Sequence, residues 1–330
     1  MSVFPKKIGK LAHVRVIAPS RSFKIISEET RKIANERFAE LGIKVSYAKN
    51  ADEMNEFASS SVKSKADDLH AAFADKSVDI ILTAIGGYNS NEILNHLDYD
   101  LIKNNPKILC GFSDITALAN AIYAKTGLVT YSGPHFSSFG MKKGFEYTLE
   151  YFKKCFFSEE AFLIEAAKEW SDDPWFMEQD NRTFIPNDGH WLINKGKENK
   201  AEGKIMGGNL CTINLLQGTD YMPNLEGSIL FIEDDSMTID VEFSRNLTSL
   251  LQEKSAKNIK AVVVGRFQKE SNISKDRLSA ILMSKEQIKD LPIIANVDFG
   301  HSTPIIAFPI GGTASIEFRD GRYEIKIIKH

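Results

Sequence analysis

Short apolar runs alternate with amphipathic segments over the first part of this 330-residue chain. Three runs, VRVIA at 14–18, VDIILTAIGG at 78–87 and KILCG at 107–111, are rich in the aliphatic residues of buried strands. Between them lie segments with helical periodicity, such as residues 28–41. This order predicts an α/β fold with a parallel sheet covered by helices on both faces.

Ligands of such sheets bind at the carboxyl ends of the strands. Gly86 and Gly87 close one predicted strand, and Ser113 follows another in the sequence GFSD, directly before an amphipathic helix. A serine at this junction is either an exposed nucleophile or a plain helix N-cap, and the local pattern leaves both open. The common GxSxG signature is not met, because Ile115 stands where the second glycine would be.

The second part of the chain resumes the alternation after an interruption. Residues 157–203 are polar and charged but contain all three tryptophans, which predicts a connector with irregular structure. We therefore expect an N-terminal α/β domain over 1–156, a connector or substrate loop over 157–203, and a C-terminal mixed α/β domain over 204–330. The chain should end in a hairpin that turns at Asp320-Gly321.

Composition narrows the classes of function. A net charge of −3 without a polybasic run offers no field for nucleic acid. Three cysteines without CxxC spacing fit neither a disulfide framework nor a zinc site, and the GxGxxG, GxxxxGK[ST] and HExxH motifs are absent. No apolar window suits a membrane span or a secretory signal. We therefore expect a cytoplasmic protein without metal or organic cofactor.

A nucleophilic serine needs a histidine base and an acid that orients the histidine. Among seven histidines, His135 follows a Gly-Pro pair and His301 lies in the glycine-flanked loop NVDFGHSTP, so both are candidates. For the acid, Glu233 ends a predicted strand and is followed by Asp234 and Asp235. The residues alone do not choose among these three acids.

Several segments together resemble one family in order and spacing over nearly the whole chain: AIGGYNSNEILNHLDYDLI, PKILCGFSDITAL, GLVTYSGP, GGNLCTINLLQGT, LFIEDDS and GHSTP. They are similar to the LD-carboxypeptidase family of serine peptidases. The resemblance implies a Ser-Glu-His triad carried by Ser113, Glu233 and His301, and an oxyanion hole from the backbone N–H groups of Gly87 and Asp114. It also implies an active site between the two domains and a homodimer.

The family has two branches with different substrates. One removes the terminal D-alanine of murein tetrapeptides, and the other, the microcin-immunity branch, cleaves the amide between an aminoacyl group and a nucleotide-like sulfamate or phosphoramidate. The phrase GGYNSNEIL and the tryptophan-bearing connector resemble the second branch. The resemblance implies a ring that stacks on the nucleobase, with Trp175 the best match, Trp191 second, and Asn209 a weaker substrate contact. Alternatively, these tryptophans only attach the connector to the domains.

We therefore expect a serine hydrolase that acts on a small aminoacyl-nucleotide or short peptide, with the microcin-immunity type of substrate favoured. Murein tetrapeptide hydrolysis is the nearest alternative. A non-catalytic protein that binds small ligands on the same two-domain plan is an alternative of another class.

Overall fold

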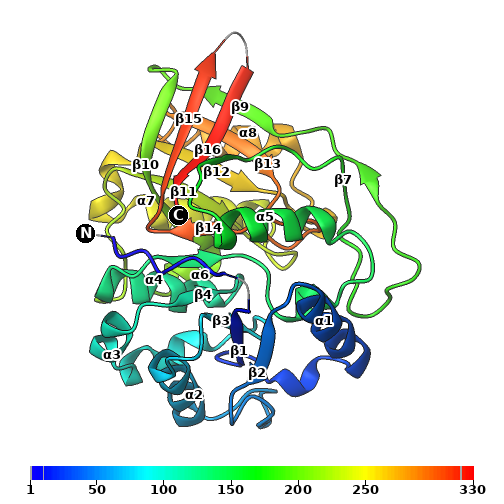
Figure 1. Ribbon diagram of the computed structural model, residues 1–330. Coiled ribbons are helices and arrows are strands. Elements are labelled where there is room, and N and C mark those ends of the chain that lie inside the picture. Colours follow the sequence, from blue (N-terminus) through cyan, green and yellow to red (C-terminus); the bar gives the residue numbers. More distant parts are fainter. Residues whose placement is uncertain (1, 10, 320–321) are drawn as a thin grey trace.

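The computed structural model describes residues 2–9, 11–319 and 322–330, and it contains two α/β domains joined by a long connector (Figure 1). In Figure 1 the N-terminal domain, blue to cyan, lies below the C-terminal domain, yellow to red. The green connector runs along one side of both domains. This arrangement confirms the predicted fold class.

The N-terminal domain is built on a six-stranded sheet with the order β14-β5-β4-β3-β1-β2. Five of its strands are parallel: β1 (His13–Ile17), β2 (Lys44–Tyr47), β3 (Ile80–Thr83), β4 (Ile108–Cys110) and β5 (Thr130–Ser132). The central strands β3 and β4 are fully buried, as expected where helices cover both faces. The sixth strand, β14 (Phe308–Ile310), comes from the C-terminal part of the chain and pairs antiparallel with β5.

Five α-helices accompany this sheet in the described part of the chain: α1 (Glu28–Glu40), α2 (Val62–Ala74), α3 (Tyr99–Asn104), α4 (Ile115–Thr126) and α5 (Glu146–Phe157). Ser27 caps α1, because its hydroxyl accepts the backbone N–H of Thr30 at 3.2 Å. Gly42 follows the end of α1 with a φ of +70°, a conformation that favours glycine. A 3₁₀ helix, η2 (Ser90–His96), follows shortly after Gly86 and Gly87.

The C-terminal domain contains an eight-stranded mixed sheet with the order β6-β16-β15-β10-β11-β12-β13-β9. Its parallel centre consists of β10 (Lys200–Asn209), β11 (Ser228–Glu233), β12 (Ala261–Gly265) and β13 (Pro292–Val297). The helices α6 (Leu210–Asn214), α7 (Asp240–Leu251) and α8 (Lys275–Met283) lie in the connections between these strands. The predicted hairpin is formed by β15 (Thr313–Arg319) and β16 (Arg322–Lys329), and its turn at Asp320-Gly321 lies outside the described residues.

The connector is more regular than its composition predicts. Its segments β6 (Phe162–Leu163) and β9 (Trp191–Lys195) are edge strands of the C-terminal sheet, and β7 (Glu169–Trp170) pairs with β8 (Ile185–Pro186). An edge strand such as β9 is only partly buried, so its sequence need not alternate between apolar and polar residues. The expected boundary at residue 204 lies inside β10.

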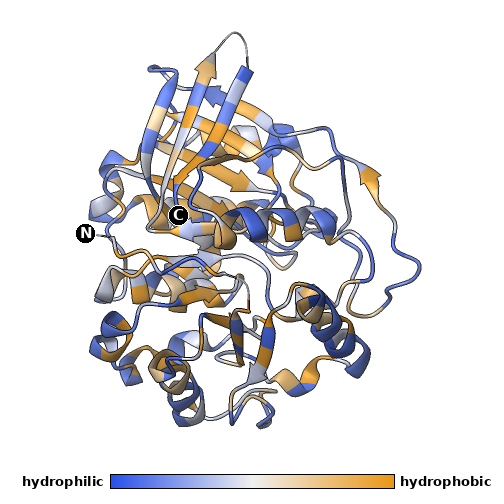
Figure 2. Cartoon of the chain, viewed as in Figure 1, coloured by the Kyte–Doolittle hydropathy of each residue, from blue (hydrophilic) through white to orange (hydrophobic). Residues whose placement is uncertain are grey.

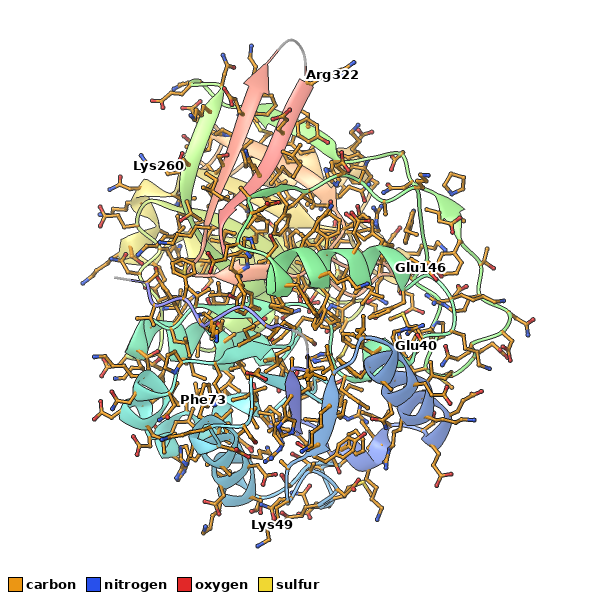
Figure 3. All side chains as sticks on the ribbon, in the orientation of Figure 1. Glu40, Lys49, Phe73, Glu146, Lys260 and Arg322 are labelled. Atoms are coloured by element: carbon orange, nitrogen blue, oxygen red, sulfur yellow. The ribbon has the colours of Figure 1, made fainter. Side chains whose placement is uncertain are left out.

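Hydrophobic residues gather on the strands of both sheets, whereas the outer helix faces are hydrophilic (Figure 2). Phe73 is fully buried, and the charged side chains of Lys49, Lys260 and Arg322 lie at the margin of the molecule (Figure 3). One continuous cluster of buried apolar residues includes members of both domains. The two domains therefore pack as one body. No helix in the described ranges is both long and apolar enough to cross a membrane.

Candidate active site

Ser113 lies on a tight turn between β4 and α4. Its φ is +60°, a left-handed conformation that is strained for a residue other than glycine and is typical of functional turns. A side chain at position 111 would collide with Thr83 Oγ1 and would lie 3.1 Å from Ile115, so the turn requires glycine there. The turn therefore holds the partly exposed Ser113 hydroxyl between strand and helix.

Three side chains from both domains meet at this turn. His301 Nε2 lies 3.0 Å from Ser113 Oγ, and His301 Nδ1 lies 2.8 Å from Glu233 Oε2. Glu233 is the last residue of β11, and His301 follows β13, so the C-terminal domain carries the candidate acid and the candidate base. An ionised carboxylate only accepts hydrogen bonds, so Nδ1 carries the proton and Nε2 is free to accept the Ser113 hydroxyl.

The charge of Glu233 acts on the imidazole. Burial by itself would lower the pKa of His301, but Glu233 opposes it, with smaller contributions from Asp235 and Asp234, and the pKa is raised above its ordinary value. Gly300 makes the contact possible, because a Cβ at this position would lie 2.9 Å from Glu233 Oε2. The acid thus both orients the imidazole and favours its protonated form.

The two neighbouring aspartates have other partners. Asp234 is buried, and its pKa is raised to about 7 by burial and by the adjacent Glu233 and Asp235. Its Oδ1 accepts the side-chain amide of Asn209 at 3.2 Å. Asp235 Oδ1 accepts the backbone N–H of Met237 at 2.9 Å. Among the described residues, the carboxylate that contacts His301 is that of Glu233.

His135, the other histidine that the sequence left open, is enclosed beneath the serine turn. Its Nδ1 donates to Thr83 Oγ1 at 2.7 Å, while the Thr83 hydroxyl donates to the carbonyl of Cys110 at 3.2 Å. Burial, with repulsion from His301, lowers the pKa of His135 to about 3. Its ring stacks on Phe112 with centroids 4.3 Å apart. His135 therefore stays neutral and supports the turn, without a carboxylate partner among the described residues.

The two residues expected to form an oxyanion hole lie on segments that one carboxylate ties together. Asp114 Oδ2 accepts the Ser20 hydroxyl at 2.5 Å and the backbone N–H groups of Asn89 and Ser90 at 3.0 and 2.9 Å. The loop that contains Gly87 is thereby attached to the residue after Ser113. A Cβ on Gly86, the residue before Gly87, would lie 3.2 Å from Ser113 Oγ, so this loop runs beside the candidate nucleophile.

Ser113 and His301 open into a cavity of about 370 Å³. Both domains and the connector line it: Arg21, Gly87 and Tyr88 come from the N-terminal domain, Trp175 and Phe176 from the connector, and Asp235, Met237 and Gln268 from the C-terminal domain. This volume suits a small molecule. Arg21, Tyr88 and Gln268 were not expected from the sequence, although Arg21 follows β1 at the same sheet edge as Ser113.

The three predicted substrate contacts lie in different surroundings. Trp175 is half-buried and lines the cavity. Trp191 lies on β9, where its Nε1 donates to Asp188 Oδ2 at 2.9 Å, and it is not among the lining residues. Asn209 is also outside the lining. Its Oδ1 caps α6 by accepting the N–H of Thr212 at 3.0 Å.

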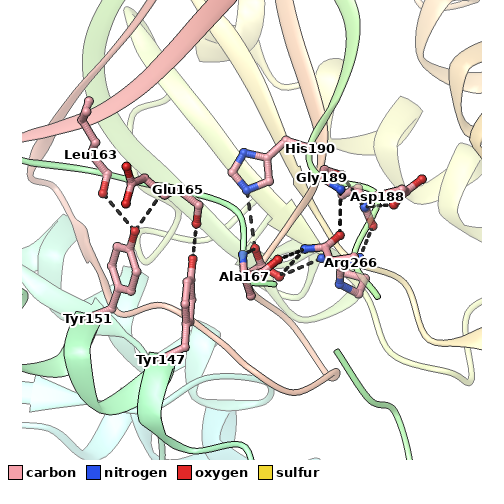
Figure 4. Close-up of polar contacts among 12 residues, drawn as sticks. Tyr147, Tyr151, Leu163, Glu165, Ala167, Asp188, Gly189, His190 and Arg266 are labelled. Carbon is pink, nitrogen blue, oxygen red and sulfur yellow. Dashed lines mark hydrogen bonds and ion pairs between the residues drawn. The ribbon is translucent and has the colours of Figure 1, made fainter. Parts of the chain in front are cut away.

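The connector is held beside the His301 loop by a buried ionic network that the sequence did not indicate (Figure 4). Arg266 Nη2 donates to Asp298 Oδ1 at 2.7 Å, and Asp298 Oδ2 accepts the backbone N–H of Ala167 in the connector at 2.9 Å. His190 Nε2 lies 3.5 Å from the same oxygen. Asp298 precedes His301 by three residues, so the network ties the connector to the segment that carries the imidazole.

A second contact joins the connector to that loop. Ser171 and Thr303 exchange backbone hydrogen bonds of 2.8 and 2.7 Å. Trp175 follows Ser171 by four residues and is therefore held on the wall of the cavity next to His301. Within the ranges that the structure describes, no group of three or more His, Cys, Asp or Glu side chains could hold a metal ion.

Comparison with known protein families matches both domains. The N-terminal domain of LD-carboxypeptidases matches residues 14–133, and the C-terminal domain matches residues 202–316. The Bacillus subtilis (strain 168) protein YocD, provisionally named a carboxypeptidase, is 51% identical over 99% of this chain and 100% of its own length. The microcin C7 self-immunity protein MccF of Escherichia coli is 31% identical over 84% of this chain and 82% of its own.

A more distant relative is the murein tetrapeptide carboxypeptidase of Pseudomonas aeruginosa, which is 24% identical over 84% of each chain. Among solved structures, an MccF-like protein from Bacillus anthracis str. Ames is 50% identical with a TM-score of 0.97 over 100% of both chains. MccF in complex with glutamyl sulfamoyl guanosine gives a TM-score of 0.88 at 27% identity over 99% of this chain and 98% of its own. This protein therefore belongs to the LD-carboxypeptidase family and is a serine peptidase of the carboxypeptidase type.

Proposed function

We propose that this enzyme hydrolyses the amide between an aminoacyl group and a nucleotide-like sulfamate or phosphoramidate, with Ser113, His301 and Glu233 as its triad. The observation that carries the proposal is the continuous relay from Glu233 Oε2 through His301 to Ser113 Oγ, with distances of 2.8 and 3.0 Å. These are the distances at which a base can remove the proton of a nucleophile. The strained backbone of Ser113 supports the same role.

The proposed reaction follows from this geometry. His301 Nε2 takes the proton of Ser113 as its oxygen attacks the scissile carbonyl, and Glu233 stabilises the imidazolium that forms. The backbone N–H groups of Gly87 and Asp114 stabilise the tetrahedral oxyanion. His301 then protonates the leaving nitrogen, and water releases the acyl group from Ser113.

The class of substrate is supported by the relative and by the connector. MccF has been crystallised with glutamyl sulfamoyl guanosine, and a tryptophan-to-phenylalanine variant of MccF with adenosine monophosphate. Here Trp175 lines the cavity beside Phe176, with ring centroids 6.1 Å apart. Stacking of a base on one aromatic ring contributes about 1–3 kcal/mol and accepts any nucleobase.

The test is hydrolysis of glutamyl sulfamoyl adenosine by the wild type and by Ser113→Ala. The wild type should release glutamate, whereas Ser113→Ala should be inactive with an unchanged circular dichroism spectrum. The partly exposed Ser64 on α2, which does not line the cavity, offers a matched control, and Ser64→Ala should keep full activity. Substantial hydrolysis by Ser113→Ala would refute the assignment of the nucleophile.

Murein tetrapeptide is the second candidate substrate, favoured by the Pseudomonas aeruginosa relative. Both substrates should be assayed side by side. Release of D-alanine without cleavage of the sulfamoyl nucleotide would select the murein reaction, and Trp175→Ala should then have little effect. Failure of a fluorophosphonate probe to label Ser113 would favour a non-catalytic binding protein. The homodimer and the cytoplasmic location stay predictions, and light scattering after size exclusion tests the first.

A further inference from the structure

We infer that Arg21 forms an anion-binding subsite in the active-site cavity and selects substrates with a negatively charged oxygen group near the scissile bond. The inference rests on the proposed function, because it concerns the same cavity. Arg21 follows β1 by four residues, at the edge of the sheet where Ser113 also lies.

The backbone of Arg21 is held on two sides. Its N–H donates to the carbonyl of Gly86 at 3.4 Å, and it forms an antiparallel bridge with Ser59. Its side-chain stem packs over Gly87: a Cβ on this glycine would lie 2.6 Å from Arg21 Cγ and 3.2 Å from Cδ. The stem therefore lies directly on the loop that borders Ser113, and Arg21 lines the same cavity as Ser113.

Arg21 has an unbalanced charge. Among the described residues that line the cavity, Arg21 is the only lysine or arginine. Two other buried or partly buried arginines bind carboxylates: Arg15 binds Asp75 at 3.1 Å, and Arg266 binds Asp298 at 2.7 Å. In contrast, no hydrogen bond or ion pair joins the guanidinium group of Arg21 to another group within residues 2–9, 11–319 and 322–330.

The acids nearest in the site are already engaged. Glu233 binds His301, Asp235 accepts the N–H of Met237, and Asp114 Oδ2 has three donors, one of them Ser20. Arg21 therefore lines the cavity with five guanidinium N–H donors that have no acceptor among the described residues. A guanidinium group keeps its charge in proteins, and its planar fork matches the oxygens of a carboxylate, sulfamate or phosphate.

Two parts of an aminoacyl nucleotide carry such oxygens: the sulfamate or phosphoramidate on the leaving side, and the carboxylate of an acidic aminoacyl side chain. A tetrapeptide would offer its terminal carboxylate instead. The shared chemistry is an anionic oxygen group close to the carbonyl under attack. Arg21 thus favours an anionic substrate in a cavity whose other walls are largely uncharged.

The test compares Arg21→Gln and Arg21→Lys with the wild type on four substrates. Glutamyl and glutaminyl groups are each joined to sulfamoyl adenosine, which is anionic, and to 5′-amino-5′-deoxyadenosine, which gives a neutral amide. Hydrogen bonds to charged groups contribute about 1.5–3 kcal/mol, so Arg21→Gln should lower kcat/KM about 10- to 150-fold where the recognised anion is present. Without that anion the ratio of variant to wild type should stay within about twofold, and Arg21→Lys should retain part of the preference.

The pattern of losses identifies the anion. If kcat/KM falls only for the two sulfamoyl substrates, Arg21 binds the leaving group. If it falls only for the two glutamyl substrates, Arg21 binds the acyl side chain. An equal loss on all four substrates, or none on any, overturns the inference. Lys24→Gln is the matched control, because it removes one positive charge from an exposed residue outside the cavity and should change nothing.

Binding separates this inference from the proposed function. Calorimetry with glutamyl sulfamoyl adenosine should show weaker binding to Ser113→Ala/Arg21→Gln than to Ser113→Ala, whether or not the wild type cleaves this compound. Cleavage of the tetrapeptide alone would refute the proposed substrate. The role of Arg21 would stand if Arg21→Gln lowers kcat/KM for the tetrapeptide but not for its C-terminal amide. Equal binding of all these ligands by both proteins would overturn the inference.

Discussion

The floor and the rim of the cavity are built in different ways. The floor consists of residues at strand ends, Ser113, Glu233 and His301, each fixed by short contacts and by neighbouring glycines. The rim consists of loop residues such as Tyr88, Phe176 and Met237, whose side chains are 73%, 66% and 70% exposed. Rigid strand ends hold the reacting atoms in fixed positions, whereas the residues of exposed loops can be replaced without disturbing the fold. Changes at the floor should therefore reduce catalysis, and changes at the rim should alter the choice of substrate.

The largest effect is expected from the acid of the floor. Glu233→Gln keeps the shape but removes the charge that stabilises the imidazolium, and should lower kcat by about 10⁴-fold, as in other triads. Asp234→Asn and Asp235→Asn are matched controls and should retain most activity, because neither carboxylate contacts His301. If one of these aspartate variants were the inactive one, the acid would be wrongly assigned. Steady-state kinetics measures kcat of the three variants, and circular dichroism checks that each variant folds.

The next effect concerns the oxyanion loop. A methyl group at Gly87 would collide with Ser20 Oγ and would lie 2.6 Å from Arg21 Cγ, so the loop must shift in Gly87→Ala. Displacing one oxyanion donor should lower kcat about 10²- to 10³-fold. Gly9→Ala is a control at an exposed glycine outside the active-site cavity, where a Cβ would meet no atom within 4 Å and φ is not positive. An unchanged kcat in Gly87→Ala would exclude this loop from the oxyanion hole.

A smaller effect is expected at the rim. Trp175→Ala should raise KM for glutamyl sulfamoyl adenosine by about 5- to 150-fold, the equivalent of a stacking energy of about 1–3 kcal/mol. The kcat should change much less, because the ring does not touch the triad. Trp191→Ala provides the matched control, since this ring lies outside the cavity. Equal losses in both variants would mean that the tryptophans act only by attaching the connector.

The smallest effect is a shift in the dependence on pH. Because the pKa of His301 is raised above its ordinary value, the base is neutral only at higher pH, and log kcat/KM should rise through a pKa above about 6.5. Asp235→Asn should move this rise of log kcat/KM to lower pH, because Asp235 contributes to the raised pKa of His301. If log kcat/KM rises over the same pH range in Asp235→Asn as in the wild type, Asp235 does not act on the imidazole. The measurement is kcat/KM between pH 5 and 9.

The floor could be anticipated from the sequence because its determinants are local. Periodic apolar residues predicted the strands and helices, and glycines beside Ser113 and His301 marked their turns. The choice of Glu233 over its aspartate neighbours, however, needed the family resemblance. It is the structure that brings its Oε2 to 2.8 Å from the imidazole.

The rim was harder to anticipate because it depends on contacts between distant parts of the chain. The anchor from Asp298 to Ala167 joins residues 131 positions apart. The edge strand β9 is recognisable only once β13 is known to lie beside it. Asn209 could not be told from a free amide in the sequence, although its side chain is engaged by Thr212 and Asp234.

Covalent labelling by a fluorophosphonate tests the proposed activation of Ser113 by His301 most directly, with the adduct located by mass spectrometry. The wild type should carry the label on Ser113, and His301→Ala should react at least about 10³-fold more slowly, because no other base contacts the hydroxyl among the described residues. Labelling of another residue, or an undiminished rate in His301→Ala, would contradict the proposal that His301 activates Ser113.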